Sequence, residues 1–387
     1  MTFRVAFNAT SLLAPLTGIG NYTIQLGAAL AETGEIDPFS FYGFRWRHEA
    51  PTAPSSAGAA RTRLRLRDAV KPFVPFKREL RSLQQRTAFA RGLRRHAIAL
   101  YHEPNYVPIG YDVPVVITVH DLSWIRYPEM HPKDRIRWLT QRMPQALERA
   151  AAVLTDSEFV RRELLQTFPV APGRVHTAYL GVSANFRPRS EAETLPTLRA
   201  LDLVHGRYLL TVGTIEPRKN VAHVLAAYAR LPQTLRDAYP LVVAGAKGWR
   251  APDLERQLRV LAASGHVRFL GHISGEQLPS LYAGAAAFVF ASLYEGFGLP
   301  PLEAMASGVP VMVSDRASLP EIAGGAAALL DPDDPTGTAA RIAAILDDDD
   351  ARARYVRLGR ARAARFSWSA CAGAALEVYR ETLRLSG

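Results

Sequence analysis

The sequence predicts an α/β protein made of two doubly wound parallel-sheet domains. Two observations support this fold class: short apolar runs alternate with helical patterns in each half, and a polar segment at 186–205 with two prolines separates the halves. Such alternation is typical of parallel sheets that helices cover on both faces. With 387 residues, 48% of them hydrophobic and 21% charged, the chain is long enough for two globular cores.

The first half opens with a strand, a glycine turn and a helix. Residues 3–9 form a short apolar run, Gly18-Ile-Gly-Asn21 follows, and 22–31 has helical spacing. A second long helical pattern covers 133–149. Further strands are expected at 39–44, 97–101, 113–119, 152–155 and 175–179. We assign these elements to an N-terminal domain at 1–185.

The second half repeats the alternation after the polar segment, which we interpret as a linker region. Its strands are expected at 208–213, 241–244, 267–270, 287–291, 309–313 and 327–330. We assign a second domain to 186–362 and expect 363–387 to form a helix that packs back on the first domain. Ligands of open parallel sheets bind beyond the carboxyl ends of the strands, so two facing domains would form one cleft.

The segment Glu295-Gly-Phe-Gly-Leu-Pro-Pro-Leu-Glu303 follows the expected strand at 287–291. Prolines 300 and 301 are typical of the start of a helix, and Gly308 of its end. The free N–H groups at such a helix N-terminus form an anion site suited to a diphosphate. Gly296 and Gly298 would let the backbone approach that ligand closely.

Two carboxylates flank this anion site, with Glu303 expected in the first turn of the helix and Glu295 in the loop before it. Since carboxylates repel phosphates, they would serve another part of the ligand. A carboxylate is a good bidentate acceptor for vicinal hydroxyls, so one would bind a ribose and the other a sugar. The alternative is that Glu303 complements the helix dipole and Glu295 is a solvated loop acid.

Two cations, Arg218 and Lys219, follow the expected strand at 208–213. They could neutralise a diphosphate leaving group, where negative charge grows as a glycosidic bond breaks. The alternative is an exposed turn with ordinary surface charges.

The Glu-x7-Glu segment resembles the donor-site signature of the retaining family 4 glycosyltransferases, which have the GT-B fold. The resemblance covers nearly the whole chain, is strongest at 209–334 and weakest at 45–95. It implies that Glu303 binds the nucleotide ribose and Glu295 the hydroxyls of the donor sugar. It also implies that Arg218 and Lys219 bind phosphate, although Thr214 stands where many members have an Arg. The implied donor contacts in the segment itself are Gly296, Phe297, Gly298 and Leu299.

The first half carries three further segments that resemble the family pattern. Gly18 and Gly20 match the glycine loop that covers the donor phosphate, although the full Gly-x-Gly-x-x-Gly pattern is absent. His120 follows the expected strand at 113–119, so its imidazole should project into the cleft and contact the donor sugar. We assign the strand-end segments at 155–158 and 179–182 to architecture.

The resemblance implies transfer of a hexose from a nucleoside diphosphate sugar to a hydroxyl, with retention at the anomeric carbon. A GDP-sugar carrying mannose or a deoxyhexose such as rhamnose is the first choice, and a UDP-hexose is the alternative. The expected acceptor is a glycan or a lipid-linked saccharide in polysaccharide or lipopolysaccharide assembly. The chain contains no Asp-x-Asp triplet, so no metal or other cofactor is expected. A non-catalytic sugar-nucleotide binder is the other alternative.

The net charge is +11, and 61–95 is locally basic, with twelve Arg or Lys against two acids. Either this region docks on an anionic membrane surface, where a lipid-linked acceptor would lie, or it is a solvated face. The sequence contains no nucleic-acid-binding motif, so nucleic acid is not expected as a partner. Cys371 is the single cysteine, and the N-terminus does not resemble a signal peptide. We therefore expect a cytoplasmic protein, peripheral on the inner face of the membrane if it docks.

Overall fold

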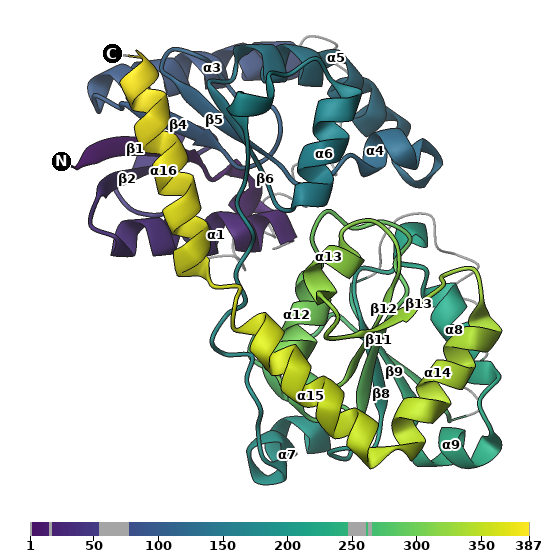
Figure 1. Cartoon of the computed structure of the whole chain (residues 1–387). Helices are drawn as coiled ribbons and strands as arrows, with labels where there is room; N and C mark the ends of the chain where they lie inside the picture. The colour runs from purple at the N-terminus through teal and green to yellow at the C-terminus, as the bar shows by residue number, and fades with distance from the viewer. Residues whose placement is uncertain (1, 15–17, 54–76, 247–260, 262–264, 387) are drawn as a thin grey trace.

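The structure is a computed structural model that describes the chain except for residues 1, 15–17, 54–76, 247–260, 262–264 and 387. It consists of two α/β domains, each with one sheet between layers of helices (Figure 1). Most of the basic segment at 61–95 lies outside the described residues, and its side chains are described only from Leu83 onward.

The N-terminal sheet has seven strands in the order β3-β2-β1-β4-β5-β6-β7. All neighbours pair in parallel except β2 and β3, which form an antiparallel hairpin at one edge. The strands are β1 Phe3–Asn8, β2 Ile36–Tyr42, β3 Arg45–Arg47, β4 Leu100–Glu103, β5 Val115–Val119, β6 Ala152–Thr155 and β7 Val175–Thr177. The sequence did not predict β3, because three residues with two arginines carry no apolar run.

Helices connect these strands and cover the sheet. The described ones are η1 Thr10–Leu13, α1 Gly18–Glu32, α3 Lys77–Arg95, α4 Ser123–Arg126, η2 Pro128–Met130, α5 Lys133–Arg149, α6 Glu158–Thr167 and η3 Pro172–Arg174. The helix α5 has the predicted bounds because its buried residues, Leu139, Met143, Ala146 and Leu147, recur at helical spacing. Strands β4 and β5 are buried along their whole length, as expected for a sheet covered on both faces.

The second sheet has six parallel strands in the order β10-β9-β8-β11-β12-β13. They are β8 Leu209–Val212, β9 Leu241–Ala244, β10 Val267–Gly271, β11 Ala287–Phe290, β12 Val311–Ser314 and β13 Ala328–Leu330. The strand order reverses between β8 and β11, which are direct neighbours. Loops diverge at such a switch point, and ligands of doubly wound sheets bind there.

The second half also contains η4 Pro217–Lys219 and a series of helices. These are α7 Glu191–Ala200, α8 Val221–Ala229, α9 Gln233–Ala238, α11 Leu278–Ala283, α12 Leu299–Ala306, α13 Leu319–Ala323, α14 Pro335–Asp347, α15 Asp349–Ala363 and α16 Trp368–Ser386. The helix α16 leaves the second sheet and lies against α1 of the N-terminal domain (Figure 1). Buried Tyr379 anchors α16 there, because its hydroxyl hydrogen-bonds Nδ1 of buried His102.

The prediction of a linker region at 186–205 is wrong in part, because this segment contains helix α7. Ser190 and Glu193 form a capping box at the start of this helix, with each side chain bonded to the other residue's backbone N–H. Buried Leu198 packs the helix against α11. Pro196 concealed the helix in the sequence, since proline is unfavourable within a helix.

No helix within the described part of the chain is long and apolar enough to cross a membrane.

Candidate active site

The loops after β8 and β11 bring three of the predicted site residues together. Arg218 and Lys219 lie in η4 after β8, and Glu295 lies after β11. Lys219 Nζ is 2.6 Å from Glu295 Oε1, and Arg218 Nη1 is 3.2 Å from Glu295 Oε2. Because β8 and β11 are neighbours at the switch point, residues 77 positions apart share one site.

These three groups are largely buried, and their charges compensate one another. Burial alone would raise the pKa of Glu295, but Lys219 and Arg218 outweigh it and hold that pKa below its usual value. Burial likewise opposes the charge of Arg218, whose pKa is nonetheless raised by Glu295, Asp121 and Glu216. The two cations therefore keep a carboxylate ionised beside a site suited to phosphate, which answers the objection that carboxylates repel phosphates.

Arg218 and Lys219 differ in their partners. Arg218 is shared between Glu295, Glu216 at 2.8 Å and the backbone carbonyl of Tyr294 at 2.6 Å. Lys219 pairs with Glu295 and lies 5.5 Å from the centre of the Phe290 ring. Arg218 thus holds the two loops together as well as carrying charge, whereas Lys219 carries a compact point charge.

Helix α12 begins at Leu299 and has proline in its first turn, as predicted. Gly298 precedes it with φ +117°, a conformation that L side chains rarely adopt. The Phe297 ring is buried and packs against Tyr179 and Phe366, so it is the backbone of Phe297 that faces the start of the helix. The N–H groups of this first turn lie where the sequence places the anion site, whose role stays a prediction.

The position of Glu303 corrects the prediction. The helix contains no acid in its first turn, and Glu303 is its fifth residue, one turn further along than expected. It therefore does not complement the helix dipole directly. Burial raises the pKa of Glu303 to about 7, and the adjacent Tyr282 opposes this shift. The predicted contact with a ribose remains untested by this geometry.

His120 does not project its imidazole freely into the cleft, which corrects another expectation. Its Nδ1 lies 2.8 Å from Asp156 Oδ2, and its Nε2 lies 2.8 Å from the carbonyl oxygen of Pro104. Both partners are acceptors, an arrangement that favours the doubly protonated ring. Burial alone would lower the pKa of His120, but Asp156 and Pro104 outweigh it and raise it.

The backbone of His120, by contrast, does face the segment Glu295 to Glu303. A side chain built on Gly296 would place its Cβ 1.8 Å from the carbonyl oxygen of His120. The hydroxyl of Ser157 also donates to the carbonyl of Gly296 at 2.6 Å. Gly296 is therefore a point of close contact between the two domains, and only glycine fits there.

Gly18 and Gly20 are placed differently from the prediction. Both lie within the first turn of α1 and not in a loop ahead of it, with Gly18 exposed and Gly20 buried. The residues immediately before them, 15–17, lie outside the described part of the chain. A contact with the donor phosphate would therefore come from the N-terminus of α1.

Tyr294 joins the two domains beside the site, and the sequence analysis did not single it out. Its hydroxyl donates to Glu163 of α6 and accepts from the backbone N–H of Leu122 at 3.0 Å. Glu163 is also 2.5 Å from Arg126 Nε. Nothing in the local sequence marks the two contacts of Tyr294, since they link residues 131 and 172 positions apart.

Asp156 and Asp121 are two further site residues that the sequence analysis missed. Val119 and Thr155 are register partners in neighbouring parallel strands, so the next residues, His120 and Asp156, lie side by side. Strand pairing could have revealed that contact. Burial would raise the pKa of Asp121, but Arg218 and Ser123 lower it below its usual value. Asp121 thus faces Arg218 from the other domain.

Within the described ranges, no three His, Cys, Asp or Glu side chains cluster so as to hold a metal ion.

Both halves of the chain match known protein families. The family model "Glycosyltransferase Family 4" matches residues 16–186, and "Glycosyl transferases group 1" matches 203–362. O-antigen chain mannosyltransferase B of Escherichia coli is 37% identical over 379 residues, which cover 97% of this chain and 99% of that protein. O-antigen chain mannosyltransferase RfbU of Salmonella typhimurium is 27% identical over 347 residues, or 88% and 90% of the two chains.

Among solved structures, the sucrose-phosphate synthase of Thermosynechococcus elongatus has a TM-score of 0.75 at 21% identity, with 99% of this chain and 100% of that one covered. At that identity the likeness shows the fold, and the fold is GT-B with two Rossmann-like domains. The family is shown by the Escherichia coli relative, which aligns over nearly the full length of both chains. The chain is a glycosyltransferase and belongs to family 4.

Proposed function

We propose that this enzyme transfers mannose from GDP-mannose to a hydroxyl of a lipid-linked glycan, with retention, in O-antigen assembly. The observation that carries the proposal is Glu295 held between Arg218 and Lys219 at the switch point. The sugar is inferred from the relative named as an O-antigen chain mannosyltransferase, which is 37% identical over nearly the full length of both chains.

In this mechanism the second domain binds the donor. The α12 N-terminus and Lys219 hold the diphosphate, Glu295 accepts hydrogen bonds from mannose hydroxyls, and Glu303 accepts them from the ribose. Arg218 keeps the two loops joined through Tyr294 and Glu295. The N-terminal domain closes over the sugar, with the backbone of His120 against Gly296.

In the transfer step, the oxygen of the acceptor hydroxyl replaces the diphosphate oxygen at the anomeric carbon. The bond from that carbon to the diphosphate breaks, and the acceptor hydroxyl forms a new bond on the same face. The acceptor's proton passes to the departing phosphate oxygen, so the products are the glycoside and GDP. Lys219 and the helix N-terminus stabilise the negative charge that grows on the diphosphate. His120, held cationic by Asp156, adds positive charge from the other domain.

We propose that this chemistry needs no metal ion, since Lys219, Arg218 and a helix N-terminus already supply positive charge where the diphosphate would lie. Transfer rates should be unchanged within error after treatment with EDTA. A rate that falls with EDTA and recovers with Mg²⁺ or Mn²⁺ would show that this part of the proposal is wrong.

The donor is tested by supplying GDP-mannose, a GDP-deoxyhexose, UDP-glucose and UDP-galactose in turn with a lipid-linked acceptor. GDP-mannose should give the highest kcat/KM, and NMR of the product should show the donor's α configuration preserved. Preference for a UDP-hexose would contradict the donor assignment. Binding without transfer to any acceptor would favour a non-catalytic sugar-nucleotide protein.

We further propose that the enzyme works on the cytoplasmic face of the membrane and docks there through the basic segment at 61–95. The acceptor's lipid would hold it at that surface, and Lys and Arg near anionic lipid each contribute about 1 kcal/mol. Sedimentation with vesicles checks this: binding should need anionic lipid and weaken with salt. Equal sedimentation with neutral and anionic vesicles would exclude docking by charge.

A further inference from the structure

An arginine-lined groove lies on the N-terminal domain, outside the site described above. Helix α3, the loop at 109–112 and helix α5 enclose it, with a volume of about 590 Å³. Five arginines line it together with an aromatic ring: Arg86, Arg91, Arg94, Arg142, Arg149 and Tyr111.

The charges in this groove are not balanced by its own residues. Among the lining residues that the structure describes, Asp112 is the one acid, and it lies 3.7 Å from Arg94. Arg149 lies over the Tyr111 ring, 4.1 Å from its centre, so the guanidinium is held in place by stacking. The five arginines are exposed, so water and salt weaken their mutual repulsion, and an anion bound among them would weaken it further.

The arginines of both helices converge on Tyr111. Burial and Glu103 raise the pKa of its hydroxyl, while Arg149, Arg86 and Arg142 each lower it, so cations of both helices act on this ring. Guanidinium groups bind phosphate oxygens in pairs of parallel hydrogen bonds. Several of them around one hollow suit a ligand with adjacent negative groups better than a single carboxylate.

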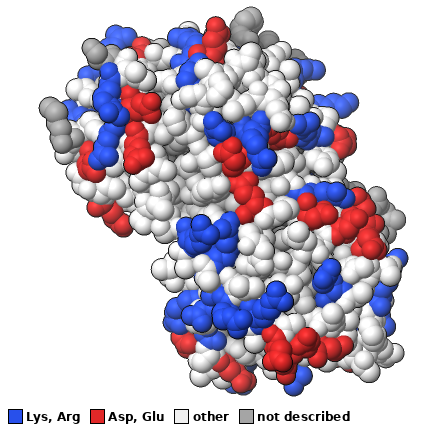
Figure 2. All heavy atoms as spheres, in the orientation of Figure 1, with Lys and Arg blue, Asp and Glu red and all other residues white. Residues whose placement is uncertain are grey.

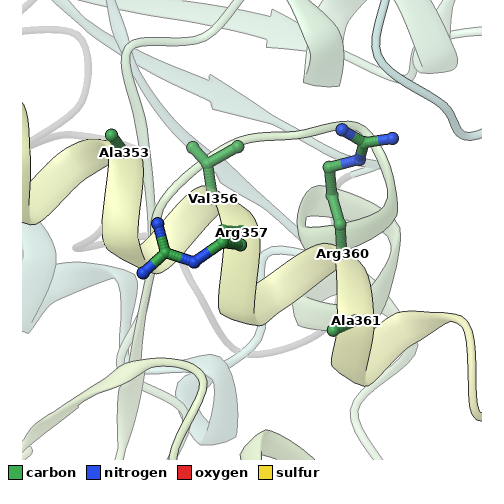
Figure 3. Close-up of a pocket in the computed structure, with 5 residues that line it drawn as sticks. All are labelled: Ala353, Val356, Arg357, Arg360 and Ala361. Carbon is green, nitrogen blue, oxygen red and sulfur yellow. The ribbon is translucent and has the colours of Figure 1, made fainter.

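A second hollow, which is also lined by arginines, can be compared with this groove. It lies on α15 (Figure 3), has a volume of about 530 Å³ and is lined by five residues of that one helix, including Arg357 and Arg360. Figure 2 shows Lys and Arg over the region where Figure 1 draws α15. Those two arginines are flanked by alanine and valine of the same helix and do not come from two helices.

The groove is connected to the active site by helix α5. Arg135, in the first turns of α5, lowers the pKa of Asp121, which faces Arg218 across the cleft. From Arg135 to Arg142 the helix rises roughly 10 Å, and to Arg149 roughly 21 Å. A short oligosaccharide with its reactive end in the cleft could follow α5 and reach the groove with its other end.

We propose that this groove binds the diphosphate that joins the acceptor glycan to its lipid. The inference rests on the proposed function, since it names the part of the acceptor that the N-terminal domain recognises. The enzyme then selects acceptors by length, because it binds the reactive hydroxyl in the cleft and the diphosphate between α3 and α5. Acceptors with a short glycan between these points fit, and a monosaccharide diphosphate is too short.

The kinetic test compares two acceptors that carry the same oligosaccharide, one on an alkyl diphosphate and one on a neutral alkyl chain. Arg142→Gln and Arg149→Gln should each raise KM for the diphosphate acceptor about tenfold or more. KM for the neutral acceptor and for the donor should stay unchanged. Arg137→Gln is the matched control, an exposed arginine of α5 that does not line the groove.

Equal changes with both acceptors, or no change with either, would overturn the proposal. So would an effect that appears only when the diphosphate acceptor is embedded in anionic vesicles, since the groove would then sense the membrane surface. The same assay with monosaccharide diphosphate should give a KM as poor as that of the neutral acceptor.

Calorimetry with inorganic pyrophosphate separates this proposal from the proposed function. The full-length protein should bind it at a site that Arg142→Gln and Arg149→Gln weaken and that Lys219→Ala and Arg137→Gln leave intact. That result would support the groove even if no donor gives transfer. Binding that Lys219→Ala abolishes and Arg142→Gln leaves unchanged belongs to the donor site and would contradict the groove.

Discussion

The two halves of the active site are built in different ways. In the C-terminal domain, charged side chains in two adjacent loops pair directly, with Glu295 between Arg218 and Lys219. In the N-terminal domain, the imidazole of His120 is enclosed by acceptors of its own domain, and its backbone makes the contact across the cleft. The C-terminal half presents charge to a ligand, whereas the N-terminal half presents a fixed surface.

This difference suggests a division of labour. The C-terminal half should determine donor affinity and the stabilisation of the leaving group, because its charges lie where a diphosphate would bind. The N-terminal half should affect the transfer step, because its contacts form only when the domains meet. Variants in the C-terminal half should therefore weaken donor binding as well as lower kcat, and variants in the N-terminal half should lower kcat alone.

The largest effect is expected from the C-terminal half. Lys219→Ala and Glu295→Ala should each lower kcat about 100-fold or more, because each removes charge that stabilises or orients the donor. Steady-state kinetics with GDP-mannose measures this, and circular dichroism checks that the fold is intact. Near wild-type rates in both variants would show that the site assignment is wrong.

The next effect should come from the partner of His120. Asp156→Asn should lower kcat roughly tenfold to 100-fold, since hydrogen bonds to charged groups are worth ~1.5–3 kcal/mol. Asp156 raises the pKa of His120, so the wild type keeps the cation to higher pH and loses it as pH rises through that pKa. The variant should therefore move the alkaline limb of the rate–pH profile to lower pH. An unmoved limb would exclude His120 as the titrating group.

Glu303→Gln should have a smaller effect, on donor binding. The wild-type carboxyl, with its pKa raised to about 7, gains its charge as pH rises through neutrality, so donor KM should fall over that range. The variant should raise donor KM roughly tenfold, or ~1.4 kcal/mol, and remove this pH dependence. A donor KM that varies with pH equally in both proteins would contradict the role in ribose binding.

The same group makes a prediction for stability. Between its ordinary pKa of 4.5 and about 7, folded Glu303 keeps a proton that the unfolded chain has lost. The free energy of unfolding should therefore fall as pH rises through this window, by up to ~3 kcal/mol. Denaturation of Glu303→Gln between pH 4.5 and 7.5 should show a flatter dependence than the wild type. Parallel curves would mean that the carboxyl titrates normally.

The smallest effect is expected at the contact between the domains. Tyr294→Phe removes the hydroxyl that joins Glu163 to the N–H of Leu122. Loss of about 1 kcal/mol of hydrogen bonding predicts a fall in kcat of about fivefold. Donor affinity should not change, because the ring still packs beside Phe159 and Tyr127. A change in donor affinity with kcat intact would assign Tyr294 to the donor half.

The two halves also differ in how far the sequence could predict them. Glu295 to Leu299 lie in one contiguous segment, and Arg218 and Lys219 directly follow a strand, so local pattern was enough to identify them. The contacts of His120 depend on the pairing of β5 with β6, which brings Asp156 from 36 positions away. Single-sequence patterns do not contain that register.

The fold was more predictable than the side-chain contacts. The strand at 152–155 and the helix at 133–149 were predicted with their observed bounds, because the strand is a short, wholly buried apolar run and the buried residues of the helix recur at helical spacing. The hairpin strand β3, helix α7 and the extra turn before Glu303 were missed. For β3 and α7, local composition opposed the element that strand pairing or capping favours, whereas α12 begins at Leu299, ahead of its prolines.

The division of labour is tested most directly by the dissociation constant for GDP-mannose, measured by calorimetry for the wild type, Lys219→Ala and His120→Ala. The account predicts that Lys219→Ala weakens binding about tenfold or more. It predicts that His120→Ala changes binding little while its transfer rate falls sharply. Intact binding in Lys219→Ala together with lost binding in His120→Ala would contradict it.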